Sequence, residues 1–157
     1  TKGHLNVLQW LKENDLPLPD KNAANEASEN GYSHILQWMK ENGLNLPNQV
    51  NINRAALNGH INVLEWLKTN GLPLPDQNGA NNVVEKGNIN VLEWFKANGL
   101  PLPNQDGANL AARYGKIEVL NWMKKNGLPL PNLDGIKMAR DWLQSKVIDW
   151  INAQSSE

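Results

Sequence analysis

The stretch that decides the fold is residues 59–71, which read GHINVLEWLKTNG. Its apolar residues stand at i, i+1, i+3 and i+4, a spacing that places them in one stripe along an α-helix. They are Val63, Leu64, Trp66 and Leu67. The closing Asn-Gly supplies a residue that adopts the left-handed conformation in which helices commonly end. The stretch therefore predicts one short amphipathic helix, called helix B below.

The same text recurs along the chain. Copies of it begin at Gly3, Gly31, Gly59, Gly87 and Gly115, and a degenerate sixth copy follows. Six of the seven Trp stand at a constant interval of 28 residues: Trp10, Trp38, Trp66, Trp94, Trp122 and Trp150. A fixed period of this size indicates a repeat array in which each unit buries its apolar face against its neighbours.

A second helix is predicted between successive copies of helix B. Each helix B is followed by Leu-Pro-Leu-Pro, or by Leu-Asn-Leu-Pro in the second copy, and these prolines hold the chain extended. The next residue is always Asp or Asn, which are preferred N-caps: Asp20, Asn48, Asp76, Asn104 and Asn132. We therefore expect a helix A of about ten residues after each cap. Small residues such as Ala55 and Ala56 mark the face on which these helices approach one another.

These elements predict an all-α, right-handed helix-turn-helix solenoid of eleven helices in 28-residue repeats, without strands or β-hairpins. We expect one array over residues 1–157. It comprises a partial unit at 1–19, helix pairs at 20–47, 48–75, 76–103 and 104–131, and a degenerate C-terminal cap at 132–157. The first helix B has no preceding helix A, so we expect upstream residues in the parent protein and poor cover over Leu5, Leu8 and Trp10.

Composition restricts the function. Fifteen basic and sixteen acidic residues give a net charge of −1, which disfavours nonspecific nucleic-acid binding. The chain lacks cysteine, a secretory signal pattern and any apolar run approaching the ~20 residues of a membrane span. We therefore expect a monomeric cytoplasmic protein that does not enter membranes.

The repeat resembles the second half of an ankyrin repeat, whose pattern runs roughly A-A-x-x-G-H-x-x-V-V-x-x-L-L-x-x-G. The matching residues are Ala55, Ala56, Gly59, His60, Val63, Leu64, Leu67 and Gly71. The Leu-Pro linker replaces the family's Thr-Pro-Leu-His entry and its β-hairpin turn. A 28-residue form with Trp is similar to ankyrin-type repeats of amoebae, oomycetes, giant viruses and amoeba-associated bacteria. The resemblance implies a protein-binding module without catalysis, in a host cytosol if the source is an intracellular pathogen or a virus.

No catalytic, cofactor or metal site is predicted. The three His residues, His4, His34 and His60, show no metal-ligand or nucleophile-base spacing. We interpret His60 as a structural hydrogen-bonding residue, and we expect the Trp column to pack in the core or against the linkers rather than to stack on bases. A repeated Asn at Asn25, Asn53, Asn81 and Asn109 predicts a ladder of hydrogen bonds to neighbouring backbone.

A partner site is predicted where the repeats differ, on the face of helix A opposite its small residues. Scaffold positions must stay alike for stacking, whereas recognition positions need not. The candidate protein-binding residues are Arg54, Asn82, Lys86, Leu110, Arg113, Tyr114, Met138 and Trp142. In one alternative, the terminal copy folds over the apolar members and covers them. Two further alternatives for the whole chain are a structural spacer and, with less support, a helical-repeat nucleic-acid reader.

Overall fold

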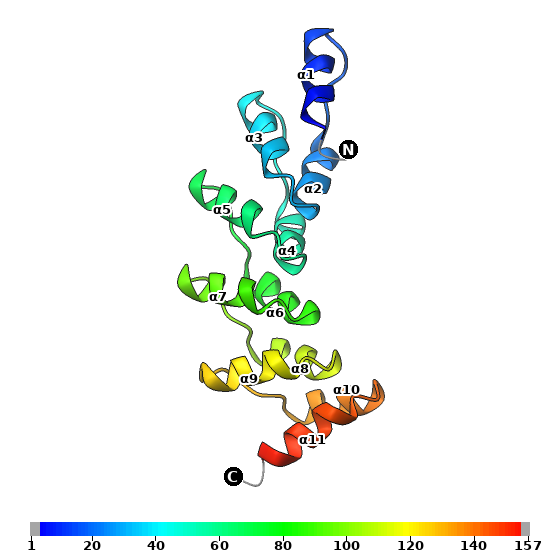
Figure 1. Cartoon of the computed structure of the whole chain (residues 1–157), viewed down its shortest axis with the longest axis vertical. Coiled ribbons are helices and arrows are strands. Elements are labelled where there is room, and N and C mark those ends of the chain that lie inside the picture. The colour runs from blue at the N-terminus through cyan, green and yellow to red at the C-terminus, as the bar shows by residue number, and fades with distance from the viewer. Residues whose placement is uncertain (1–3, 155–157) are drawn as a thin grey trace. The chain divides into compact units, whose positions relative to one another are not determined.

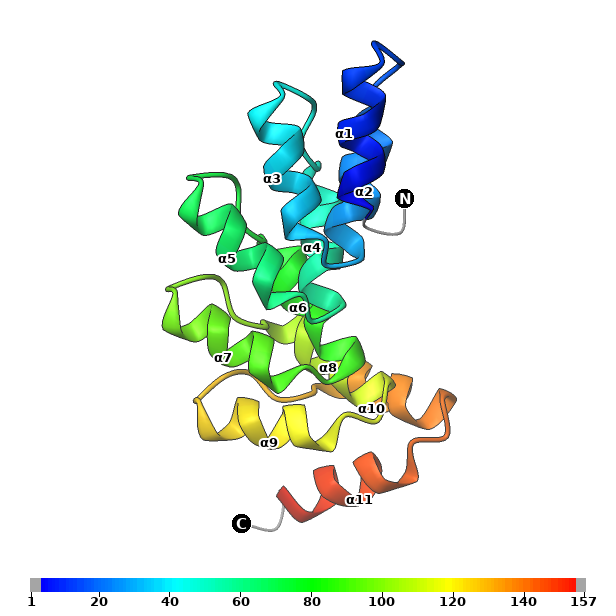
Figure 2. The ribbon, with the colours of Figure 1, turned by 45° about the horizontal axis from the view of Figure 1, so that its top comes forward.

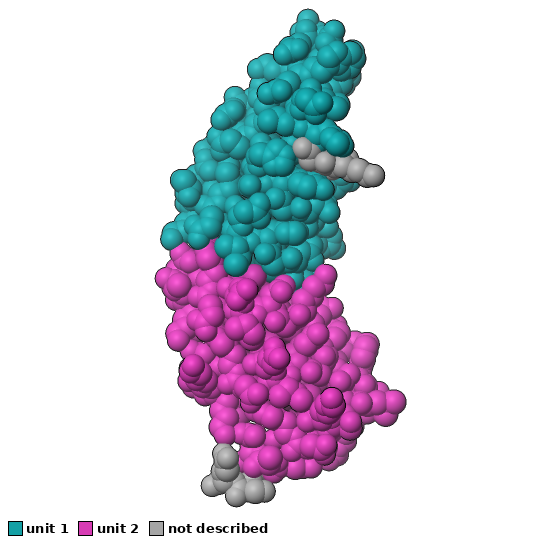
Figure 3. Space-filling model, viewed as in Figure 1, with its two compact units in different colours: residues 1–74 teal, residues 75–157 magenta. Residues whose placement is uncertain are grey.

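The computed structural model describes residues 4–154, which form α-helices joined by turns and extended linkers and contain no strand. The chain divides into two compact units, Thr1–Leu74 and Pro75–Glu157, coloured separately in Figure 3. Eleven helices lie within the described range, so the predicted all-helical repeat fold is confirmed. None of these helices has both the length and the apolar character needed to cross a membrane.

The described residues of unit 1 form five helices, which lie in two layers (Figures 1 and 2). The B helices α1, α3 and α5 pack in series, and the A helices α2 and α4 pack on each other. Their bounds are α1 Leu5–Glu13, α2 Lys21–Glu29, α3 Ser33–Glu41, α4 Gln49–Leu57 and α5 Ile61–Thr69. The core of the unit is built from the predicted stripe, with Leu36, Met39 and Leu64 fully enclosed against Ala55 and Ala56.

Unit 2 repeats this architecture with six helices. The A helices α6, α8 and α10 form one layer, and the B helices α7, α9 and α11 form the other (Figure 2). Their bounds are α6 Gln77–Lys86, α7 Ile89–Ala97, α8 Gln105–Arg113, α9 Ile117–Lys125, α10 Leu133–Asp141 and α11 Ser145–Gln154. Phe95 and Met123 fill the centre of the unit beside the small residues Ala111 and Ala112, which let α8 approach its neighbours closely.

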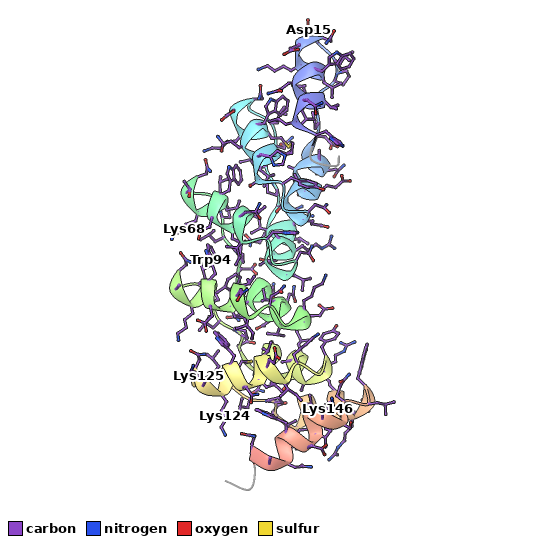
Figure 4. All side chains as sticks on the ribbon, in the orientation of Figure 1. Asp15, Lys68, Trp94, Lys124, Lys125 and Lys146 are labelled. Carbon is purple, nitrogen blue, oxygen red and sulfur yellow. The ribbon has the colours of Figure 1, made fainter. Side chains whose placement is uncertain are left out.

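The helix ends follow the predicted signals. All five predicted N-caps adopt extended backbone, and their side chains accept hydrogen bonds from the first-turn backbone N–H groups. The B helices α3, α5, α7 and α9 end at glycines with positive φ. Two other helices end without a glycine. Asp15 after α1 (φ 51°) and Leu143 after α10 (φ 53°) adopt the same left-handed conformation, which is unusual for residues with a side chain. Figure 4 labels Asp15 in the turn after α1.

At three of the four predicted positions an Asn side chain binds the linker to the preceding helix A, here called the Asn clasp, which confirms the predicted ladder there. In unit 2 the Oδ1 of Asn81 accepts from the backbone N–H of Asn104 at 3.1 Å, and Asn109 does the same for Asn132 at 3.2 Å. Gln105 adds a second donor to Asn109 and also donates to the carbonyl of Leu130 at 2.9 Å. In unit 1, Asn25 receives the backbone N–H of Asn48 at 3.1 Å.

The Trp column links successive B helices within each unit. Trp66 Nε1 donates to Gln37 at 2.6 Å, and Trp122 Nε1 donates to Glu93 at the same distance. Trp38 and Trp122 are buried, as expected, whereas Trp10 is 54% exposed, since no helix within residues 4–154 precedes α1. Leu8, which we expected to be poorly covered, is buried at 4% exposure. The packing of α1 against the next B helix, α3, is enough to bury Leu8.

A lysine recurs in the last turn of the B helices α1, α3, α5, α7 and α9, where the helix dipole favours positive charge. Within each unit the Nζ atoms of these lysines also reach the following repeat: Lys40 donates to Asn70 at 2.6 Å, and Lys124, labelled in Figure 4, donates to Gln154 at 2.5 Å. These hydrogen bonds connect the ends of successive B helices within each unit.

Candidate protein-binding surface

The predicted site residues divide between the two units, and each group has its own surroundings. Arg54 lies on α4 in unit 1. The other seven, namely Asn82, Lys86, Leu110, Arg113, Tyr114, Met138 and Trp142, lie on or directly after α6, α8 and α10 in unit 2. Five of these seven belong to the adjacent helices α8 and α10 and to the residue that follows each.

In unit 1 the A-helix surface is bonded to itself. Arg54 forms a salt bridge with Glu29, with 2.7 Å between Nη1 and Oε1. The amide of Asn51 donates to the same carboxylate oxygen, and the Asn58 amide donates to the Glu29 carbonyl at 2.9 Å. His60 Nε2 meets that carbonyl at 2.8 Å, which agrees with the structural role predicted for this His. The polar groups around Glu29 are thus satisfied internally.

In unit 2 the equivalent surface carries an aromatic cluster. The rings of Tyr114 and Trp142 meet edge to face, with centroids 6.0 Å apart. The guanidinium carbon of Arg113 lies 4.3 Å from the Trp142 ring centroid and 5.3 Å from that of Tyr114. Such contacts are cation–π interactions. We call Leu110, Arg113, Tyr114, Met138 and Trp142 the aromatic cluster.

The aromatic cluster is accessible. Trp142 is 50% exposed and Met138 is 36% exposed, while Leu110, Arg113 and Tyr114 are partly covered. The alternative in which the terminal copy covers these residues is therefore wrong for Trp142 and Met138. Helix α11 packs against α10 and α9. Asn82 is partly covered and Lys86 is exposed, one helix away on α6.

Two features escaped the sequence reasoning. One is the orphaned Nε of Arg113, which is buried and has no hydrogen-bond partner within residues 4–154. The other is a hollow of about 400 Å³ between α10 and α11, lined in part by Arg140, Leu143 and Ile148. No periodic signal marks either feature, because each depends on side-chain conformation where the repeat pattern breaks. Within the described part of the chain, no group of three or more His, Cys, Asp or Glu residues could hold a metal ion.

The chain was compared with family models, curated proteins and solved structures. No family model matches the chain, and no curated protein matches it. Among solved structures, the crystal structure of the pentatricopeptide repeat protein PPR10 from maize is similar, with a TM-score of 0.46 and 19% identity. The match covers 95% of this chain and 26% of that one, so the chain spans about a quarter of its length. The helical repeat fold itself follows from the eleven helices of the described residues and their packing on their neighbours.

Proposed function

We propose that the chain is a non-catalytic module that binds a protein partner through the aromatic cluster of unit 2. The observation that carries the proposal is the exposure of Trp142 and Met138 beside Tyr114 and Arg113. Trp, Tyr, Met and Arg are the residue types enriched at protein interfaces, and clustered Trp, Tyr and Arg dominate their energetics. A half-exposed Trp held by two neighbours is preorganised for such contact.

The repeats support an ankyrin-like type for this module. The small residues on helix A, the turn glycines and the hydrogen bonds of His60 stand where the ankyrin pattern has them. In that family the first helix of each repeat contributes to the binding face. We extend the proposal to a monomeric chain. We also propose that it works in the cytoplasm, since a chain without cysteine gains no disulfides from an oxidising compartment.

The experiment compares proteins captured from lysate by the immobilised chain and by two variants, with and without nuclease. Trp142→Ala removes the exposed indole of the cluster, and Trp10→Ala removes an equally exposed indole from α1 as a matched control. We expect a captured protein to be lost with Trp142→Ala, at a cost of about 2 kcal/mol in affinity, and to be retained with Trp10→Ala. Thermal unfolding of both variants should stay close to that of the parent chain.

Three outcomes would overturn the proposal. Capture that survives Trp142→Ala places the interface elsewhere. Capture that nuclease abolishes shows that nucleic acid carries the interaction. A structural spacer, by contrast, captures nothing in any arm.

A further inference from the structure

Arg113 occupies the position that Glu29 holds three repeats earlier, since the two residues are 84 positions, or three 28-residue periods, apart. The next helix A supplies two partners for Glu29: Arg54 pairs with its charge, and the amide of Asn51 donates a hydrogen bond to its carboxylate. The positions that correspond to these two are Gly135 and Met138. Neither has a polar side chain, so unit 2 presents a charge at this point and supplies nothing to pair with it.

The structure agrees with this reading. Within residues 4–154 the guanidinium of Arg113 has no ion-pair or hydrogen-bond partner, and its only specific contacts are the two aromatic rings. Of its nitrogens, Nε alone is both buried and unpartnered, which leaves the two Nη atoms as the accessible donors. A guanidinium held against an indole has lost much of its freedom, so ordering it on binding costs little.

The chemistry of this arrangement selects for a carboxylate. A guanidinium presents N–H donors in a planar fork that matches the two oxygens of a carboxylate, and such charge-assisted bonds are stronger than neutral ones. The cluster around this guanidinium also supplies apolar surface, since Trp142 lies against it and Met138 and Trp142 are exposed. A ligand that fits both features carries an acidic side chain next to a bulky apolar one.

We infer that the aromatic cluster binds an acidic-apolar peptide segment of a partner protein, with an Asp or Glu of that segment on Arg113 and its apolar neighbour against Trp142 and Met138. This inference rests on the proposed function and narrows it to a class of partner. A peptide is favoured over nucleic acid for two reasons. Arg113 is the single cation of the aromatic cluster, and unit 2 as a whole has as many acidic as basic residues, nine of each.

The experiment is a selection of random displayed heptapeptides on the full chain and on four variants. Arg113→Gln removes the charge of the cluster, and Arg54→Gln removes the salt-bridged arginine of unit 1 as a matched control. Met138→Glu supplies an internal carboxylate at the position from which Arg54 reaches Glu29. Trp142→Ala removes the aromatic platform. A twelve-residue oligouridylate is titrated separately as the nucleic-acid probe.

We expect the parent chain and Arg54→Gln to enrich peptides with Asp or Glu beside a large apolar residue. Arg113→Gln and Met138→Glu should lose the acidic enrichment while keeping the apolar one. Trp142→Ala should lose both. For a selected peptide, replacing its Glu by Gln should weaken binding to the parent chain about tenfold or more, and should leave binding to Arg113→Gln nearly unchanged.

The outcomes separate the two proposals. Apolar enrichment without acidic residues, or acidic enrichment that Arg113→Gln leaves intact, overturns the present inference while the protein-binding surface stands. Enrichment that Trp142→Ala does not affect, or no enrichment at all, overturns both. Binding of the oligouridylate that Arg113→Gln abolishes assigns the cluster to nucleobases and also overturns both.

Discussion

The two units differ in the residue that helix A places in its contact with the preceding repeat. At the third position of helix A, α4 in unit 1 carries Asn51, whereas α8 and α10 in unit 2 carry Gly107 and Gly135. A Cβ on Gly107 would lie 2.7 Å from the Cβ of Pro103 and 2.8 Å from the Oδ1 of Asn81. Glycine therefore lets the linker and the clasp Asn approach this closely, while in unit 1 the same position holds an amide that binds Glu29.

The residue at this position also determines which polar groups the surface of helix A offers. In unit 1 the Asn51 amide donates to the carboxylate of Glu29, which also forms the salt bridge with Arg54. Both charges therefore have a partner within the unit. In unit 2 the same position is glycine, which provides no polar group, and the guanidinium of Arg113 contacts aromatic rings. Three repeat positions differ between the two surfaces: Glu29 corresponds to Arg113, Asn51 to Gly135 and Arg54 to Met138. Together these differences separate a surface whose charges are paired from one that carries an unpaired charge.

The largest effect is expected in the cores, where the units are alike. Phe95 in α7 and Leu67 in α5 occupy the same repeat position and are 0% and 1% exposed. Phe95→Ala should cost about 3–5 kcal/mol of unfolding free energy and Leu67→Ala about 2–5 kcal/mol, because each leaves a cavity. Urea titrations followed by circular dichroism measure both. Val50→Ala, at a 59% exposed position, is the control and should stay within about 0.5 kcal/mol.

A smaller effect, specific to unit 2, is expected from Gly107→Ala. Ala is favoured over Gly inside a helix by about 1 kcal/mol, yet the added methyl would overlap Pro103 and Asn81. We expect the overlap to prevail and to destabilise the chain by about 1–3 kcal/mol. Asn51→Ala, at the equivalent place in unit 1, creates no overlap and should cost only about 1 kcal/mol through its lost hydrogen bond. A stabilised Gly107→Ala variant would show that the contact in unit 2 is loose and would remove the contrast.

Replacing the two irregular turn residues should raise stability. Leu143 ends its helix at φ 53° and is 89% exposed, so Leu143→Gly removes left-handed strain of about 1–2 kcal/mol and gives up little burial. Asp15→Gly in unit 1 should gain less, because Asp tolerates this conformation better than Leu. Thermal unfolding of both variants checks the ranking. A drop in stability with Leu143→Gly would mean that this side chain packs on the hollow beside Ile148 more firmly than its exposure indicates.

The sequence predicts the helices and their caps almost completely, because each rests on a local signal that recurs every 28 residues. The Asn clasp was predictable for the same reason, since Asn25, Asn81 and Asn109 recur at one position. The candidate site was predictable only as a set of variable residues. Its chemistry depends on whether a neighbour one repeat away accepts a bond, as Glu29 does from Arg54 and as Met138 cannot for Arg113. Such pairing is not periodic, so no repeat pattern reveals it.

The smallest effect tests the two arginines directly. Arg54→Gln breaks a partly exposed ion pair and should cost about 0.2–1 kcal/mol in low salt, where exposed pairs are weakly stabilising. At 1 M NaCl the Debye length falls to about 3 Å, so this difference should largely vanish. Arg113→Gln has no ion pair to lose. Its cation–π contact with Trp142 and the buried unpartnered Nε act in opposite directions, so the change in unfolding free energy should be near zero and insensitive to salt. Urea unfolding of both variants at low and high NaCl measures the contrast. A salt-dependent loss of stability with Arg113→Gln would mean that Arg113 already has an acidic partner within the chain, and the charge would then not be available to a peptide.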